Sequence, residues 1–128
     1  MRDIPLAIEF NRNDWYRKRV FDGLHVRGVA VASVQTDSPG AAAMPAHAKV
    51  TAPFEYFRFM GRQIRYHLRR VNQHYEDCHY TPEKLAPWAD RIASTAKWAD
   101  AYILFQHHQD AGDIYSVLLL RQLLGNTL

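Results

Sequence analysis

The run Val29-Ala30-Val31-Ala32-Ser33-Val34, which follows Gly28 directly, decides the fold class. It is an unbroken stretch of small and β-branched residues, and such stretches are typical of strands that are buried on both faces. Strands of that kind occur in parallel sheets, where the connecting helices cover the faces. The run therefore predicts an α/β protein.

The segments before this strand predict one further strand and one helix. Residues 6–10 form a short β-like run that begins after Pro5 and ends at a polar stretch. Asn13 or Asp14 would cap the helix, and Gly28 is placed to end it. The apolar face of this helix would contain Trp15, Val20, Phe21 and Leu24.

The segments after the strand continue the alternation. An irregular Ala-rich connection leads to a strand over residues 54–60, and residues 62–78 are expected to form an ordered loop with a helical turn. Thr81 and Pro82 begin a helix, because threonine caps free amides and proline suits the first helical position. This helix would run to about residue 97 and bury Leu85, Trp88, Ala89, Ile92 and Ala96. The remaining elements are a strand over residues 101–105 and a helix from Gly112 or Asp113 to Gly125.

Length and composition indicate one globular unit. The chain has 128 residues and 48% hydrophobic content, which is enough for a core and excludes disordered and fibrous classes. The net charge of +3 is too small to imply nucleic acid by itself. The only cysteine, Cys78, excludes an internal disulfide and favours a cytoplasmic location. No apolar run approaches the roughly 20 residues of a membrane-spanning helix, so no membrane contact is predicted.

Candidate functional residues follow the predicted strands directly. In parallel α/β folds the chemistry gathers at the carboxyl ends of the strands. Polar groups stand at all four ends, in residues 9–12, 35–38, 58–62 and 106–108. From them we select Glu9, Asp37 and His107 as candidate catalytic residues, and Arg12, Arg58, Arg62 and Gln106 as candidate ligand-binding residues.

The two acidic side chains allow two interpretations. Glu9 would act as a general base, or it would share a cation with Asp37 as in a metal-assisted phosphoester hydrolase, with His107 as a proton carrier. Alternatively, Glu9 pairs with an arginine such as Arg58 inside the fold, and Asp37 stabilises the turn over residues 38–40. The sequence leaves both interpretations open.

The densest basic and aromatic stretch contains Arg58, Arg62, Arg65, Tyr66, His67, Arg69, Arg70, His74 and Tyr75. Arginine binds phosphate and aromatic rings stack on bases, so a phosphorylated ligand or single-stranded nucleic acid is one interpretation. A solvated charged loop is the other, because no nucleic-acid signature accompanies the stretch. His74, Cys78 and His79 lack the paired spacing of a zinc site, so no metal is predicted there.

Motifs along nearly the whole chain resemble the second half of the YecE-like family, also called domain of unknown function seventy-two. The segments that carry the resemblance are Ala7-Ile8-Glu9-Phe10, Arg27-Gly28-Val29-Ala30, Asp37-Ser38-Pro39, residues 50–62, Tyr80-Thr81-Pro82-Glu83-Lys84-Leu85, residues 101–107 and residues 120–125. The chain departs from the family pattern at three strand ends. Asn11 stands where an arginine is usual, Met60 where a histidine is usual, and Gln106 and His107 where two asparagines are usual.

The resemblance implies half of a TIM-like (β/α) barrel. Residues 1–128 would form a single partial domain without the family's amino-terminal half, because such a barrel typically needs about 250 residues. Four strands cannot close a barrel, so the resemblance implies a second copy or a separate half-barrel partner, unless the chain is a fragment. The family has no established activity, and neither an enzyme activity nor a cofactor follows from the resemblance.

Three functions remain open from the sequence. The first is a phosphate-binding or anion-binding surface at the strand ends, where Arg58 and Arg62 contact the anion. The second is the metal-assisted phosphoester hydrolase. The third is a non-catalytic subunit whose exposed barrel face binds a second half.

Overall fold

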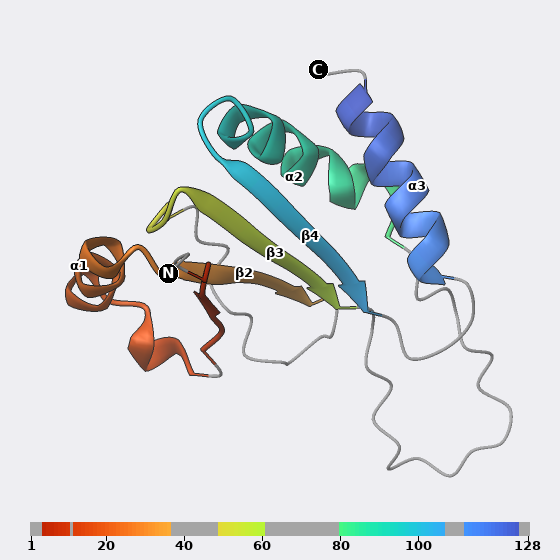
Figure 1. Cartoon of the computed structure of the whole chain (residues 1–128). Coiled ribbons are helices and arrows are strands. Elements are labelled where there is room, and N and C mark those ends of the chain that lie inside the picture. The colour runs from red at the N-terminus through yellow and green to blue at the C-terminus, as the bar shows by residue number, and fades with distance from the viewer. Residues whose placement is uncertain (1–3, 11, 37–48, 61–79, 107–111, 126–128) are drawn as a thin grey trace, which may run out of the picture.

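The computed structural model describes residues 4–10, 12–36, 49–60, 80–106 and 112–125 (Figure 1). In chain order, the elements are β1 (Ala7–Ile8), the short 3₁₀ helix η1 (Asn13–Trp15), α1 (Lys18–Arg27), β2 (Ala30–Thr36), β3 (Phe54–Met60), α2 (Pro82–Thr95), β4 (Asp100–Gln106) and α3 (Gly112–Gly125). The predicted alternation of strands and helices is confirmed. The predictions for residues 37–48 and 62–78 lie outside the described residues.

The four strands form one parallel sheet in the order β1-β2-β3-β4, as predicted. Tyr56 in the third strand lies beside Ala32 on one side and Tyr102 on the other, and this register brings all the carboxyl ends to the same edge. Residues 30–34 of the run that begins at Val29 form the first part of β2, and Ala30, Val31, Ala32 and Val34 are all buried. The composition of this strand therefore matches its burial.

One face of the sheet is covered by α2, and the core lies between them. Phe57 and Phe59 alternate along β3 toward this side, where they pack with Leu85 and Ile92 of α2 and with Phe105 of β4. The Phe59 and Phe105 rings stack with their centroids 4.9 Å apart. Burial of these side chains supplies the main apolar stabilisation of the described fold.

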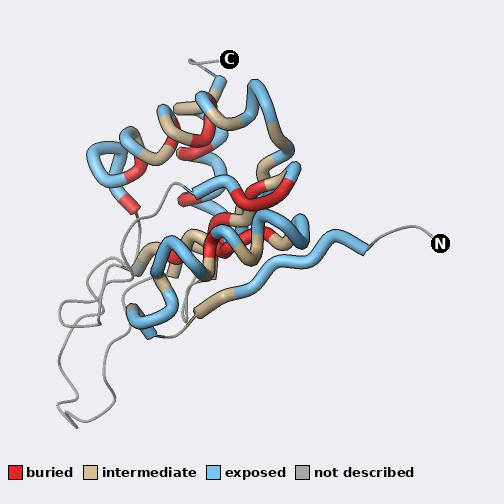
Figure 2. The backbone as a smooth tube through the Cα atoms, turned by 90° about the vertical axis from the view of Figure 1, so that its left-hand side faces the viewer, coloured by how far each residue is buried: buried red, intermediate tan, exposed pale blue. Residues whose placement is uncertain are grey.

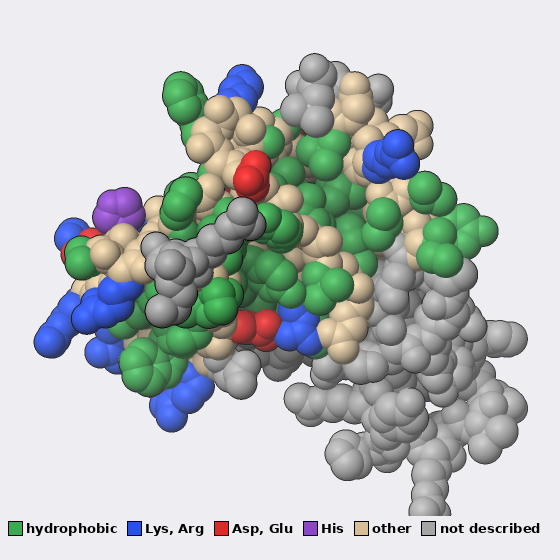
Figure 3. Space-filling model, viewed as in Figure 1, with side chains coloured by type: hydrophobic (Ala, Val, Ile, Leu, Met, Phe, Trp, Pro, Cys, Tyr) green, Lys and Arg blue, Asp and Glu red, His purple; other side chains and the backbone are tan. Residues whose placement is uncertain are grey.

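The opposite face of the sheet has no helix over it among the described elements. Side chains alternate between the faces of a strand, so Tyr56 and Arg58 of β3 point away from Phe57 and Phe59. Their neighbours on β4 are Tyr102 and Leu104, which are 54% and 46% exposed. Figure 3 looks at this face and shows apolar side chains gathered over the strands. We call this surface the open face of the sheet.

The helix α1 starts later than predicted, and the predicted cap at Asn13 or Asp14 is wrong. The helix begins at Lys18, and Arg17 at its N-cap makes no side-chain hydrogen bond to a free amide. The carboxylate of Asp14 instead pairs with Arg12 at 2.6 Å. Trp15 belongs to η1, where its ring stacks on Phe10 with centroids 5.6 Å apart.

The predicted end of α1 at Gly28 is confirmed. Gly28 has a φ of 62°, the left-handed conformation that ends helices, and its amide donates to the carbonyl of His25. β2 begins two residues later, so this turn aims the chain into the sheet. β1 is shorter than the predicted strand, because Phe10 already turns toward Trp15 beyond its end.

The helix α2 begins as predicted. The Thr81 hydroxyl accepts a hydrogen bond from the Lys84 amide, and Pro82 is the first helical residue. Leu85, Ala89 and Ile92 are buried as expected, whereas the expected burial of Ala96 is wrong because the helix ends at Thr95. No helix in the described part of the chain has the length and apolar character needed to cross a bilayer.

Candidate functional site

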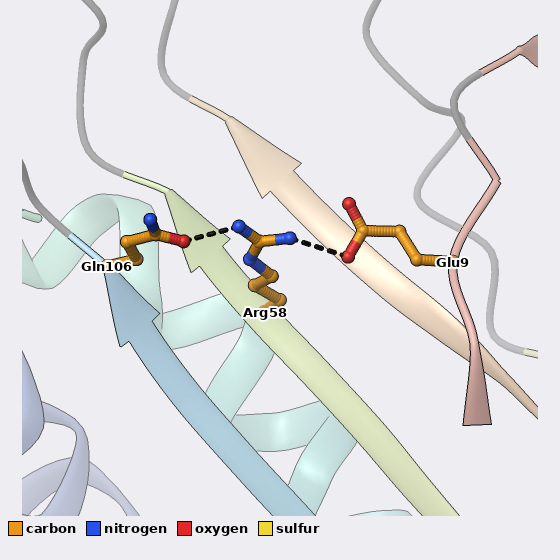
Figure 4. Close-up of polar contacts among 3 residues, drawn as sticks. All are labelled: Glu9, Arg58 and Gln106. Atoms are coloured by element: carbon orange, nitrogen blue, oxygen red, sulfur yellow. Dashed lines mark hydrogen bonds and ion pairs between the residues drawn. The ribbon is translucent and has the colours of Figure 1, made fainter. Parts of the chain in front are cut away.

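Three predicted site residues meet at the carboxyl edge of the sheet. The guanidinium of Arg58 on β3 donates from Nη1 to Glu9 Oε2 at 2.7 Å, and from Nη2 to the side-chain oxygen of Gln106. Glu9 directly follows β1, and Gln106 is the last residue of β4. Figure 4 shows the three side chains spanning the sheet on the face opposite α2. We call this group the polar cluster.

Strand register explains why the chain forms this cluster. Arg58 lies beside Val34 and Leu104, whose side chains are apolar, and it reaches diagonally to the ends of the outer strands. Gln106 lies beside Met60, two residues farther along the sheet than Arg58, so it points to the same face. The alternative in which Glu9 pairs with Arg58 is therefore confirmed.

The cluster is partly shielded from water. The side chains of Arg58 and Glu9 are 24% and 30% exposed, and their opposite charges compensate each other. Arginine carries five N–H donors, of which Glu9 and Gln106 accept two. The Nε of Arg58 is buried and has no acceptor among the described residues. The guanidinium therefore retains donor capacity toward a further acceptor.

Two tyrosines near the cluster were not selected from the sequence. Tyr80 is buried, and its hydroxyl donates to the backbone carbonyl of Met60 at 2.8 Å, with the carbonyl of Gln35 at 3.3 Å. It thereby ties together the carboxyl ends of β2 and β3. Its sequence signals are the position directly before the helix cap at Thr81 and its place at the start of the family-like segment over residues 80–85.

The second tyrosine is Tyr16, which follows η1. Burial raises the pKa of its phenol, and the nearby negative charge of Glu9 raises that pKa further. Its ring packs edge-on against Phe10 and Phe21. Tyr16 therefore brings a neutral hydroxyl group near Glu9 at neutral pH.

The other predicted residues are placed as follows. Arg12 lies on the surface with a side chain that is 75% exposed, and it pairs with Asp14 instead of joining the cluster. Asp37, Arg62 and His107 lie outside the described residues. In the part of the chain that the structure describes, no three His, Cys, Asp or Glu side chains are grouped closely enough to hold a metal ion.

Comparisons with known proteins agree with the architecture. A family model described as "Protein of unknown function DUF72" matches residues 1–128. A crystal structure of a DUF72 family protein from Enterococcus faecalis V583 superposes with a TM-score of 0.76 at 19% identity, and it covers 97% of this chain and 50% of that chain. A search of curated proteins gave no match.

A second solved structure gives the same result. A DUF72 family protein from Thermotoga maritima MSB8 superposes with a TM-score of 0.76 at 22% identity, covering 95% of this chain and 46% of that chain. At this level of identity the likeness supports the fold alone. The chain spans about half the length of the solved structures that it matches.

Proposed function

Because this chain belongs to the DUF72 family, whose function is unknown, we propose from the geometry of the polar cluster that the carboxyl edge of its sheet binds a small oxyanion such as a phosphorylated ligand. The observation that carries the proposal is the Arg58 guanidinium, whose side chain is 24% exposed and which has more N–H donors than Glu9 and Gln106 accept. An oxyanion would accept charge-assisted hydrogen bonds from the donors that Glu9 and Gln106 leave available.

The neighbours of Arg58 suit this role in different ways. Gln106 holds one side of the guanidinium through its side-chain oxygen, which leaves the amide nitrogen of Gln106 able to donate. Glu9 holds the other side, but its negative charge would repel an incoming anion. Glu9 therefore orients Arg58 and at the same time limits the affinity of the site.

Titration calorimetry with inorganic phosphate tests this proposal. Arg58→Lys keeps the charge but loses the planar fork, and we expect about 10-fold weaker binding or more. Glu9→Gln keeps the shape and removes the repelling charge, so it should strengthen binding. Arg19→Ala removes an exposed cation from α1 and is the matched control. Equal affinities in the Arg58→Lys variant and the unaltered protein would contradict the proposal.

A second candidate function is a non-catalytic half-barrel subunit that assembles with another βα unit. The observation that favours it is the open face, where Tyr102 and Leu104 of β4 are about half exposed beside Arg58. Large apolar side chains gathered on one face are typical of surfaces that another protein covers. This function and anion binding are compatible, because a second unit would enclose the polar cluster.

Three further predictions from the sequence are not tested by the described residues and stay predictions. The metal-assisted phosphoester hydrolase depends on Asp37, which the structure does not describe. A cytoplasmic location depends on the single cysteine. Nucleic-acid binding depends on the stretch from Arg58 to Tyr75, of which residues 61–75 lie outside the described residues.

A further inference from the structure

The helix α3 carries apolar side chains on two sides. Its inner side packs against the core through Leu120 and neighbouring leucines. Ile114, Val117 and Leu118 form a stripe on its outer side, at the i, i+3, i+4 spacing of one helix face, and they are 62%, 47% and 54% exposed. A helix that is apolar nearly all round is typically buried on both sides. The stripe therefore indicates a missing neighbour.

A complementary apolar surface lies at the other end of the sheet. Ile4, Leu6 and Ile8 alternate along the segment that contains β1, and they are 80%, 58% and 38% exposed. Ile8 lies beside Val31, so these side chains belong to the face of the sheet that helices cover. Figure 2 shows this segment exposed along an edge of the molecule. No helix among the described elements covers it.

The connection rule for parallel strands relates these two surfaces. A helix that follows a strand packs over that strand and the next strand of the sheet, through a right-handed crossover. In Figure 1, α3 flanks β4, whose outer edge pairs with no other described strand. A further parallel strand that joined β4 would therefore pack against α3. The outer edge of β1 is likewise unpaired within the described residues.

We propose that two copies of this chain close an eight-stranded barrel, in which β4 of each copy pairs with β1 of the other and the α3 stripe covers Ile4, Leu6 and Ile8 of the other copy. This rests on the assembly function proposed above and names its partner. A two-fold axis along the strands keeps all eight strands parallel and satisfies both edges at once. The four described strands of one copy cannot satisfy both edges alone, because four strands are too few to close a barrel.

The open faces of the two copies would form the barrel interior. Eight strands enclose a space that side chains alone can fill, and Tyr56, Tyr102 and Leu104 from each copy are suited to filling it. The two polar clusters would then lie at the same end of the barrel. Each pairs Arg58 with Glu9, so their approach brings no uncompensated charge together.

The experiment is light scattering of the purified chain, with circular dichroism to establish that it is folded. We expect twice the chain mass of 14.9 kDa. Leu118→Asp and Ile8→Asp should each weaken dimerisation by about 100-fold or more, because each places two carboxylates in apolar contacts of the dimer. Trp98→Asp is the matched control. Trp98 is 88% exposed and lies just before β4, at the amino ends of the strands, whereas the polar cluster lies at their carboxyl ends.

Mixing the two variants identifies the interface. In a mixed dimer, one junction carries both substitutions and the other carries neither, so the mixture should associate more tightly than either variant alone. A folded dimer without this rescue would overturn the proposed interface. Circular dichroism of each variant separates lost association from lost folding.

A folded monomer would overturn the proposed second copy. Co-expression with the part of the Enterococcus faecalis chain that this chain does not cover then tests the assembly function separately. Binding to that part would keep the assembly function, and a folded monomer that ignores it would overturn the assembly function as well.

Discussion

Glu55 of β3 is a buried carboxyl group whose charge affects the stability of the fold. It is 6% exposed and faces α2, near Arg91 and Thr95. Burial raises the pKa of its carboxyl group above the ordinary value of 4.5, although a hydrogen bond with Thr95 and the charge of Arg91 act in the opposite direction. The ionised form of Glu55 is therefore less favourable in the folded chain than in the unfolded chain.

We expect Glu55→Gln to change how stability depends on pH. A raised folded pKa means that the unaltered protein loses stability as pH rises from 4.5 through the folded pKa. Glutamine has no such titration and keeps the hydrogen-bonding capacity toward Thr95. Chemical denaturation at about pH 4 and about pH 7 should show the variant gaining stability relative to the unaltered protein at the higher pH.

Glu83 supplies a control of opposite sign. The amide of its own residue and then the Thr81 hydroxyl lower the pKa of this exposed carboxyl group in the first turn of α2. Its contribution to stability is present above its ordinary pKa and is lost as pH falls through the lowered value. Glu83→Gln should therefore lose stability relative to the unaltered protein as pH rises. The same trend in both variants would contradict our account of Glu55.

At the residue scale, the sequence predicted the polar cluster in part. The rule that chemistry gathers at strand carboxyl ends selected Glu9, Arg58 and Gln106, because each lies at or near the carboxyl end of a predicted strand. The structure brings these three together. The strand-end rule could not select Tyr80 from the sequence. The hydroxyl of Tyr80 reaches backbone carbonyls of β2 and β3, and only the folded sheet places these side by side.

At the scale of the elements, two glycines in or next to α1 differ in whether their backbone conformation requires glycine. Gly28 ends the helix with a φ of 62°, which strains any residue with a Cβ atom. Gly23 lies within α1, and a Cβ atom there would meet Arg27 Nη1 at 3.5 Å, which is ordinary van der Waals contact. The left-handed backbone at residue 28 therefore requires glycine, whereas the glycine at residue 23 only lowers the stability of the helix.

We expect Gly28→Ala to lower the free energy of unfolding by about 1 kcal/mol, because alanine is strained in the left-handed region. Gly23→Ala should raise it by about 1 kcal/mol, because alanine favours the helix interior. Urea denaturation of both variants measures the two effects side by side. A loss of stability in Gly23→Ala would show that the helix interior does not accept a methyl group there.

The elements that agree with prediction share one property, which is that local signals and tertiary burial point the same way. β3 was predicted over residues 54–60 and occupies Phe54–Met60, because its aromatic residues are intrinsically strand-forming and also supply the core. The predicted helix cap at Asn13 or Asp14 was wrong, because the Asp14 carboxylate forms an ion pair with Arg12 instead of capping a helix. Aromatic stacking of Trp15 on Phe10 then shaped the turn, and helical periodicity cannot reveal such a contact.

At the scale of the whole molecule, the described fold is asymmetric. One face of its sheet is buried by α2, whereas the open face keeps Tyr102 and Leu104 about half exposed. The hydrophobic effect favours covering such surfaces, and the related solved chains contain about twice the length of this one. The stability of this chain should therefore depend on what covers the open face.

If a second copy covers it, the thermal unfolding midpoint must rise with protein concentration, because association stabilises only the folded state. Calorimetry over a 100-fold range of concentration measures this. Leu118→Asp should shift the rise to higher concentration, since its dimer is weaker, and Trp98→Asp should leave the curve unchanged. A midpoint independent of concentration across the range would mean that no second copy covers the open face of the folded chain.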